Sequence, residues 1–251
     1  MSPIAISLVV FACIFGGALA GILLRTVLPE NHLSAESKST VNLGIGLVGT
    51  MAALVLGLVV SSAAGSYFAQ RDELNQMSAK LVLLDRILAH YGPEAQKARQ
   101  LMRDGVIDML DRMWPQERKH GAPVTPQVGS ADALYEQIEQ LSPRDDAQRA
   151  LKGQAVNMAM EIGRTRWLMF AQQSSPVPTP FLVIVAVWLS IVFTSFGLYA
   201  PRNATVIVAL FLGALSVGGA ILLIVELYTP FQGWIHISSA PLRAVLAQLG
   251  K

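Results

Sequence analysis

The stretch GTMAALVLGLVVSSAAGSYFAQRDELNQMSAKLVLLDRILAHYG, residues 49–92, changes from an apolar run to a charged helical pattern with no proline at the change. No charged residue precedes Arg71 in it. Beyond that point, apolar residues recur at helical spacing among charges of both signs. The stretch therefore predicts one continuous helix that leaves a membrane and continues in water.

The composition of the whole chain supports a membrane protein. Its 251 residues are 53% hydrophobic and 14% charged, whereas an average soluble domain is about 25% charged. The net charge of +2 gives no reason to expect a nucleic-acid partner. The single cysteine and four scattered histidines predict no disulfide, metal site or cofactor. With no nucleophile–base pair or phosphate loop in the sequence, we do not expect an enzyme.

Four apolar stretches are long enough to cross a bilayer, and they lie at 3–24, 41–67, 181–200 and 204–227. The first resembles a signal peptide, but no Lys or Arg precedes it and its apolar run continues past the ALA at 18–20. We expect an uncleaved anchor.

The water-compatible residues between spans two and three predict a helical insert. It carries 14 basic and 14 acidic residues. The expected fold class is all-α, a polytopic membrane protein with four transmembrane helices and a cytoplasmic helical insert continuous with the second. The expected parts are the first two spans (1–68), the insert (69–176), the last two spans (177–228) and an interfacial or cytoplasmic tail (229–251).

The even number of spans places both termini and the insert on one side of the membrane. That side carries more basic residues next to the spans, which favours the cytoplasm. We therefore expect a multi-pass protein of the inner (plasma) membrane. The basic residues on the insert side are Arg71, Arg164, Arg166 and Arg243, and those on the opposite side are Arg25, Lys38 and Arg202, offset by Glu30 and Glu36.

A row of small residues at every fourth position of the second span predicts a close helix contact. Small side chains let helix backbones approach in lipid, where packing drives association. Small residues are also common in membrane helices without such a role. The row consists of Gly49, Ala53, Gly57, Ser61 and Gly65.

The neighbouring row is polar at both ends and apolar in the middle. Around a shared axis, several copies would form a narrow apolar ring between wetter vestibules, a construction that gates channels by dewetting. A row facing lipid or the protein core is the alternative. The candidate pore-lining residues are Thr50, Leu54, Leu58, Ser62 and Ser66.

Beyond the membrane the same helix has apolar residues at three-and-four spacing, which predicts a buried seam in a helical bundle. The seam consists of Tyr67, Gln70, Leu74, Met77, Leu81, Leu84, Leu88 and Tyr91, and we expect Val82, Leu83 and Ile87 to widen it. Further helices are expected at 93–114, around 134–141 and from Ser142, which we take as a helix cap, to about 173.

Glu226 is the only acidic residue in any apolar run. It lies near the end of its span and is a candidate for an ion or salt-bridge site with Arg71 or Arg243, or a simple interfacial glutamate. Tyr228, Phe231 and Trp234 follow as an expected interfacial aromatic cluster. A short last helix, capped by Ser238 or Ser239, has one apolar face consisting of Leu242, Val245, Leu246 and Leu249.

Three stretches resemble the bestrophin-like domain family of bacterial membrane proteins, and the resemblance covers nearly the whole chain. They are AQRDELNQMSAKLVLLDRILAHYGPEA (69–95), LYAPRNATVIVALFLGALSVGGAILLIVEL (198–227) and PFQGWIHISSAPLRAVLAQLG (230–250). That family is distantly similar to bestrophins, which are pentameric anion channels whose second span lines the pore. The resemblance implies a homo-oligomer, membrane lipids as neighbours, chloride as a permeant ion, and Thr50, Leu54, Leu58 and Ser62 on or near the pore. The acidic run of the bestrophin calcium clasp has no counterpart after TPFQG.

The expected function is therefore a homo-oligomeric ion channel, anion rather than cation. Two alternatives stay open: a non-conducting scaffold or sensor that acts through its helical insert, and a stator-type subunit of a proton pathway.

Overall fold

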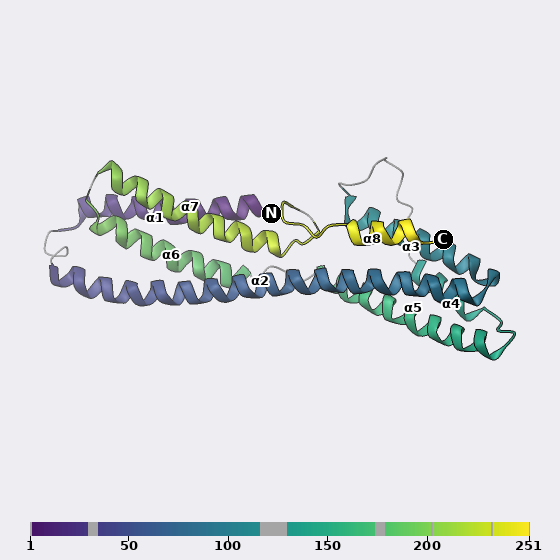
Figure 1. Ribbon diagram of the computed structural model, residues 1–251. Coiled ribbons are helices and arrows are strands. Elements are labelled where there is room, and N and C mark those ends of the chain that lie inside the picture. The colour runs from purple at the N-terminus through teal and green to yellow at the C-terminus, as the bar shows by residue number, and fades with distance from the viewer. Residues whose placement is uncertain are drawn as a thin grey trace. The chain divides into compact units, whose positions relative to one another are not determined.

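The computed structural model describes residues 2–29, 35–115, 130–173, 179–201, 203–231 and 233–250, and no strand occurs in those ranges (Figure 1). This confirms the all-α fold class. The elements in chain order are α1 (Pro3–Val27), α2 (Ala35–Tyr91), η2 (Pro93–Ala95), α3 (Gln96–Met113), α4 (Ser130–Glu139), α5 (Asp146–Gln173), α6 (Thr179–Tyr199), α7 (Ala204–Leu227) and α8 (Ala240–Gln248).

Four of these helices, α1, α2, α6 and α7, are long and apolar enough to cross a membrane. Glu30 and Arg202, which entered the charge comparison, lie outside the described residues.

The chain divides into two compact units. Unit 1 comprises Met1–Tyr67 and Pro176–Thr229, and unit 2 comprises Phe68–Ser175 and Pro230–Lys251. Helix α2 contributes its first part to unit 1 and its second part to unit 2.

Helix α2 runs for 57 residues without a break, as the opening stretch predicts. It contains no proline. It ends at Tyr91, and Gly92 follows with a φ of 127°, in a region that side chains disfavour. Pro93 follows and begins η2.

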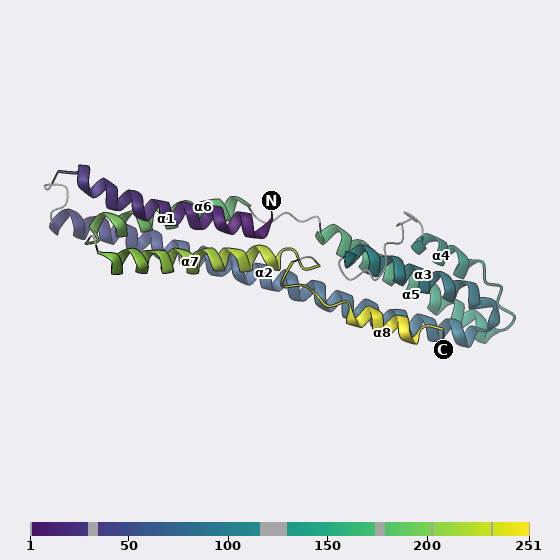
Figure 2. The same ribbon diagram turned by 90° about the horizontal axis from the view of Figure 1, so that it is seen from above.

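The core of unit 1 forms where α1 packs against α6 and α7 (Figures 1 and 2). Part of α2 joins this core through Val59 and Ala63. The helix ends are capped locally: the Ser2 hydroxyl accepts a hydrogen bond from the Ala5 amide, and the Asn203 side chain accepts one from the Val206 amide. These caps fix where α1 and α7 begin.

The core of unit 2 is built on the predicted seam of α2. Leu74, Leu84 and Leu88 are fully buried. One expectation is wrong: Leu83 is 48% exposed and does not widen the seam. Leu83 lies about 100° round the helix from Leu84, outside the arc that the neighbouring helices cover.

The first turn of α5 also differs from the prediction. The cap is Asp145, not Ser142, because the Asp145 carboxylate accepts the Gln148 amide at 2.7 Å. The Gln148 side chain in turn accepts the Arg144 amide at 2.8 Å and donates to the Tyr91 carbonyl at 2.9 Å. A reciprocal cap of this kind satisfies the free amides of the first turn and also joins α5 to the end of α2.

Candidate functional site

In unit 1, α2 has a buried face and an open face. Ala52 and Ala63 are fully buried and Val59 is 5% exposed, all three toward the core of the unit. On the opposite side, Leu54 is 76% exposed and Leu58 is 66% exposed. In the part of the chain that the structure describes, this span therefore keeps one long apolar face uncovered.

The candidate pore-lining row begins on this open face and turns away from it. Thr50 is exposed, and its hydroxyl donates to the Leu47 carbonyl at 2.8 Å. Ser62 is exposed, and the Tyr228 hydroxyl donates to its oxygen at 3.5 Å. Ser66 is half-buried. The row drifts because four residues make slightly more than one helical turn.

The row of small residues lies beside the leucines, and its glycines have open space beside them. Among the described residues, no atom lies within 4 Å of where a Cβ would stand on Gly49, Gly57 or Gly65. Ala53 and Ser61 are exposed. The role of this row in helix packing therefore stays a prediction.

The close contact between small residues within the chain lies elsewhere, between α1 and α6. A Cβ on Gly21 would stand 2.0 Å from the Thr194 carbonyl oxygen, and one on Gly197 would stand 2.0 Å from the Ala18 carbonyl oxygen. The backbones touch there, as small residues allow in membrane helices. The GGALAG run at 16–21 carries the signal, but the sequence analysis did not use it.

Helices α1 and α7 are joined by a polar contact in the same unit. The Ser7 hydroxyl, which is buried, donates to the Gly218 carbonyl at 2.7 Å. Phe11 and Phe15 pack edge-on against Phe211 nearby, with ring centroids 5.5 Å apart. Helices α1, α6 and α7 therefore form a tight scaffold.

Glu226 is 6% exposed and lies in the last turn of α7. Arg71 is exposed, and Arg243 donates from Nε to the Ser239 hydroxyl at 3.0 Å. A pair between Glu226 and either arginine stays a prediction, since those arginines belong to unit 2.

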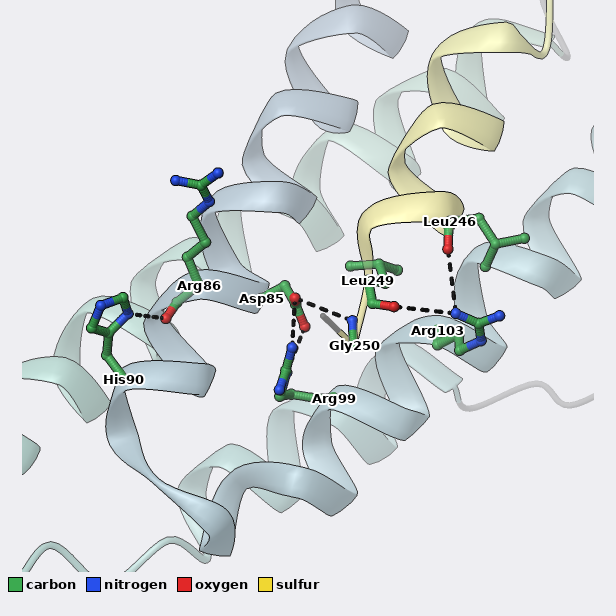
Figure 3. Close-up of polar contacts among 8 residues, drawn as sticks. All are labelled: Asp85, Arg86, His90, Arg99, Arg103, Leu246, Leu249 and Gly250. Atoms are coloured by element: carbon green, nitrogen blue, oxygen red, sulfur yellow. Dashed lines mark hydrogen bonds and ion pairs between the residues drawn. The ribbon is translucent and has the colours of Figure 1, made fainter.

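Unit 2 contains a polar cluster that the sequence analysis missed. Asp85, on α2, is buried and accepts two hydrogen bonds from Arg99, on α3, at 2.7 and 2.9 Å (Figure 3). The hydrogen bond with Asp85 and its negative charge raise the pKa of Arg99. The Gly250 amide also donates to Asp85, at 3.4 Å. One carboxylate thus joins α2, α3 and the tail.

Arg103, which lies one turn after Arg99 on α3, binds the end of α8. Its guanidinium donates to the carbonyls of Leu246 and Leu249, at 3.3 and 3.2 Å (Figure 3). These carbonyls have no partner inside a helix that ends there, so a cation stabilises them. Because Leu242 and Val245 are buried as predicted, α8 packs on the helical bundle of unit 2.

The expected aromatic cluster after α7 is only partly right. Trp234 is 81% exposed, but Phe231 is buried, with its ring edge-on to Trp114 at 5.5 Å between centroids. The Trp114 indole donates to the Ile237 carbonyl at 2.7 Å. Phe231 therefore belongs to the core of unit 2, which ties the segment before α8 to the end of α3.

Within the ranges that the structure describes, no three His, Cys, Asp or Glu side chains lie close enough to hold a metal ion.

The sequence also matches a known protein family. The family model described as the bestrophin-like domain matches residues 12–242. The chain belongs to the bestrophin-like domain family. No curated protein matches the sequence.

Solved structures of a bacterial bestrophin homologue from Klebsiella pneumoniae share the fold. One variant is 14% identical with a TM-score of 0.65, covering 94% of this chain and 97% of the other. A second variant is 16% identical with a TM-score of 0.64, covering 96% of each chain. The fold of that homologue therefore extends over nearly the whole of this bestrophin-like protein. It is a fold of membrane proteins.

Proposed function

We propose that copies of this protein assemble around a central axis and form a bestrophin-type ion channel whose pore is lined by α2. The observation that carries the proposal is the open face of α2 around Leu54 and Leu58, opposite the buried face at Val59 and Ala63. Membership of the bestrophin-like family supports the same reading.

The open face has the chemistry of a hydrophobic constriction. Leu54 and Leu58 lie between Thr50 and Ser62, whose hydroxyls would wet the two approaches. A narrow leucine ring between polar rings excludes water until it widens. In this account Gly57, Ser61 and Gly65, on the side of the same face, let a neighbouring copy approach closely.

The subunit number and the permeant ion come from the resemblance alone. We propose a pentamer that conducts anions, chloride among them, with the insert and both termini in the cytoplasm. The basic residues next to the spans support this orientation. We also propose the four parts of the chain given above, which are 1–68, 69–176, 177–228 and 229–251. The ion pair of Glu226 with Arg71 or Arg243 is a proposal as well.

The test is to record purified protein in planar bilayers under a sodium chloride gradient. The proposal predicts unitary currents whose reversal potential shifts toward that of chloride. A shift toward sodium would contradict anion selectivity. A silent but well-formed oligomer would favour a scaffold or sensor, and a current that needs a second co-expressed subunit would favour a stator.

A further inference from the structure

Unit 1 contains a groove between the first part of α2 and the last part of α6. Its volume is about 440 Å³, within the range of sites that bind small organic ligands. On the α2 side it is lined by residues that recur on one helical face, and on the α6 side by the last two turns. The lining residues are Lys38, Asn42, Ile45, Gly46 and Gly49 of α2, Val192, Ser195, Phe196 and Tyr199 of α6, and Ala200.

The groove has a polar end and an apolar floor. Lys38 and Asn42, in the first two turns of α2, lie at the polar end with Tyr199, the last residue of α6. The Lys38 ammonium stands 5.9 Å from the centre of the Tyr199 ring. Arg25, near the end of α1, donates to the carbonyl of Ala200 at this end as well. Lys38 and Arg25 therefore both lie at this end of the groove, where α1 and α6 end and α2 begins.

The floor of the groove is open because it contains glycine. Among the described residues, no atom lies within 4 Å of a Cβ built on Gly46 or Gly49. Phe196, across the groove, is 51% exposed. The one acidic residue described in the first turn of α2, Glu36, lies about 200° round the helix from Lys38 and does not line the groove.

We propose that this groove binds a glycerophospholipid. Its phosphate would accept hydrogen bonds from Lys38 and Asn42, and one acyl chain would lie over Gly46 and Gly49 against Phe196. Charge complementarity at the polar end and the apolar floor match the two parts of a phospholipid. The groove opens on helices that span a membrane, so lipid reaches it directly. The proposal does not depend on conduction or on a pore.

The test is native mass spectrometry of the intact protein. The delipidated protein is titrated with phosphatidylglycerol, and bound lipid is counted per subunit. Lys38→Gln removes the phosphate contact, and Gly46→Leu fills the floor. The matched controls are Lys97→Gln, an exposed lysine on α3, and Gly219→Leu, an open glycine on α7. We expect Lys38→Gln to weaken binding by about threefold to tenfold, the effect of losing one charge-assisted contact. Gly46→Leu should also weaken binding, because the leucine side chain takes the space of the acyl chain.

Three outcomes would overturn the proposal. Bound lipid could be unchanged in both groove variants, or reduced equally in the controls, which would mean that lipid binds to the surface in general. Alternatively, Gly46→Leu could change the subunit number while lipid binding stays the same. A second copy of the chain would then be the occupant of the groove.

Discussion

Asp85 and Arg99 form a two-point ion pair that fixes the end of α2 to α3. Arg99 donates from Nε and Nη2 to the two carboxylate oxygens, at 2.7 and 2.9 Å. The side chain of Asp85 is 8% exposed and that of Arg99 is 20% exposed. Since Gly250 also donates to Asp85, the tail is held at the same point.

Replacing this buried acid loosens both contacts. We expect Asp85→Asn to lower the free energy of unfolding by about 1–3 kcal/mol, because the Arg99 guanidinium loses its charged partner. Amides of α8 should also exchange hydrogen faster. Thermal unfolding and hydrogen exchange of the detergent-solubilised protein measure the two effects. Asp104→Asn, an exposed acid on α3, is the control and should change neither. Equal effects from both variants would contradict the role of Asp85 in holding α2, α3 and the tail together.

The backbone contact between α1 and α6 leaves no room for a methyl group. A Cβ on Gly197 would stand 2.0 Å from the Ala18 carbonyl oxygen and 3.1 Å from the Ile22 nitrogen. Gly197→Ala should therefore cost about 1–3 kcal/mol, as overpacking does, and reduce the yield of monodisperse protein. Gly219→Ala, where space is open, should not destabilise the protein. Normal stability of Gly197→Ala would mean that the helices lie further apart.

Because of Tyr91, we expect the folded protein to lose stability at high pH. Its hydroxyl is buried without a hydrogen-bond partner among the described residues, and burial raises the pKa of Tyr91 above its ordinary value of 10.0. As pH rises above about 10, the unfolded chain releases this proton more readily than the folded chain, so unfolding becomes easier.

Tyr91→Phe removes both the unpaired hydroxyl and this sensitivity. Its apparent Tm near pH 7 should equal or exceed that of the wild type, and the advantage should grow above pH 10. Tyr135→Phe, at an exposed tyrosine, should show no such growth. If the difference between Tyr91→Phe and the wild type stays constant with pH, the Tyr91 hydroxyl ionises as freely in the folded protein as in the unfolded chain.

The small-residue row on α2 predicts an effect on assembly. Gly57 has open space around it within one chain, so Gly57→Leu should leave the subunit fold intact. If another copy packs there, a leucine prevents close approach, and the oligomer should dissociate in a mass measurement. Gly16→Leu, at an open glycine of α1, is the matched control. Normal assembly of Gly57→Leu would remove this row from any subunit interface.

Much of the fold can be predicted from the sequence because its signals are local. Apolar runs mark the four spans, and three-and-four spacing marks the seam at Leu74, Leu84 and Leu88. The buried face of α8 follows from the same rule. Boundaries are less certain: Ser142 and Asp145 are both good helix caps, and only the packed structure selects Asp145.

The contacts that fix the structure are less predictable because they join distant residues. The Asp85–Arg99 pair and the Phe231–Trp114 pair follow no spacing rule. The glycines of α1 are visible in the sequence, but the residue that Gly21 meets on α6, Thr194, emerges only when the two helices pack. The candidate pore row is predictable only as a pattern of polar and apolar residues at every fourth position.

A pore lined by α2 would be constricted at Leu58. The most direct test compares the unitary conductance of wild type, Leu58→Ser and Leu212→Ser in planar bilayers. Leu212, on α7, is 54% exposed and provides a matched outward leucine. The account predicts that Leu58→Ser raises the conductance by wetting the ring, while Leu212→Ser leaves it unchanged. Unchanged conductance in Leu58→Ser, or an equal rise in both variants, would contradict a pore lined by α2.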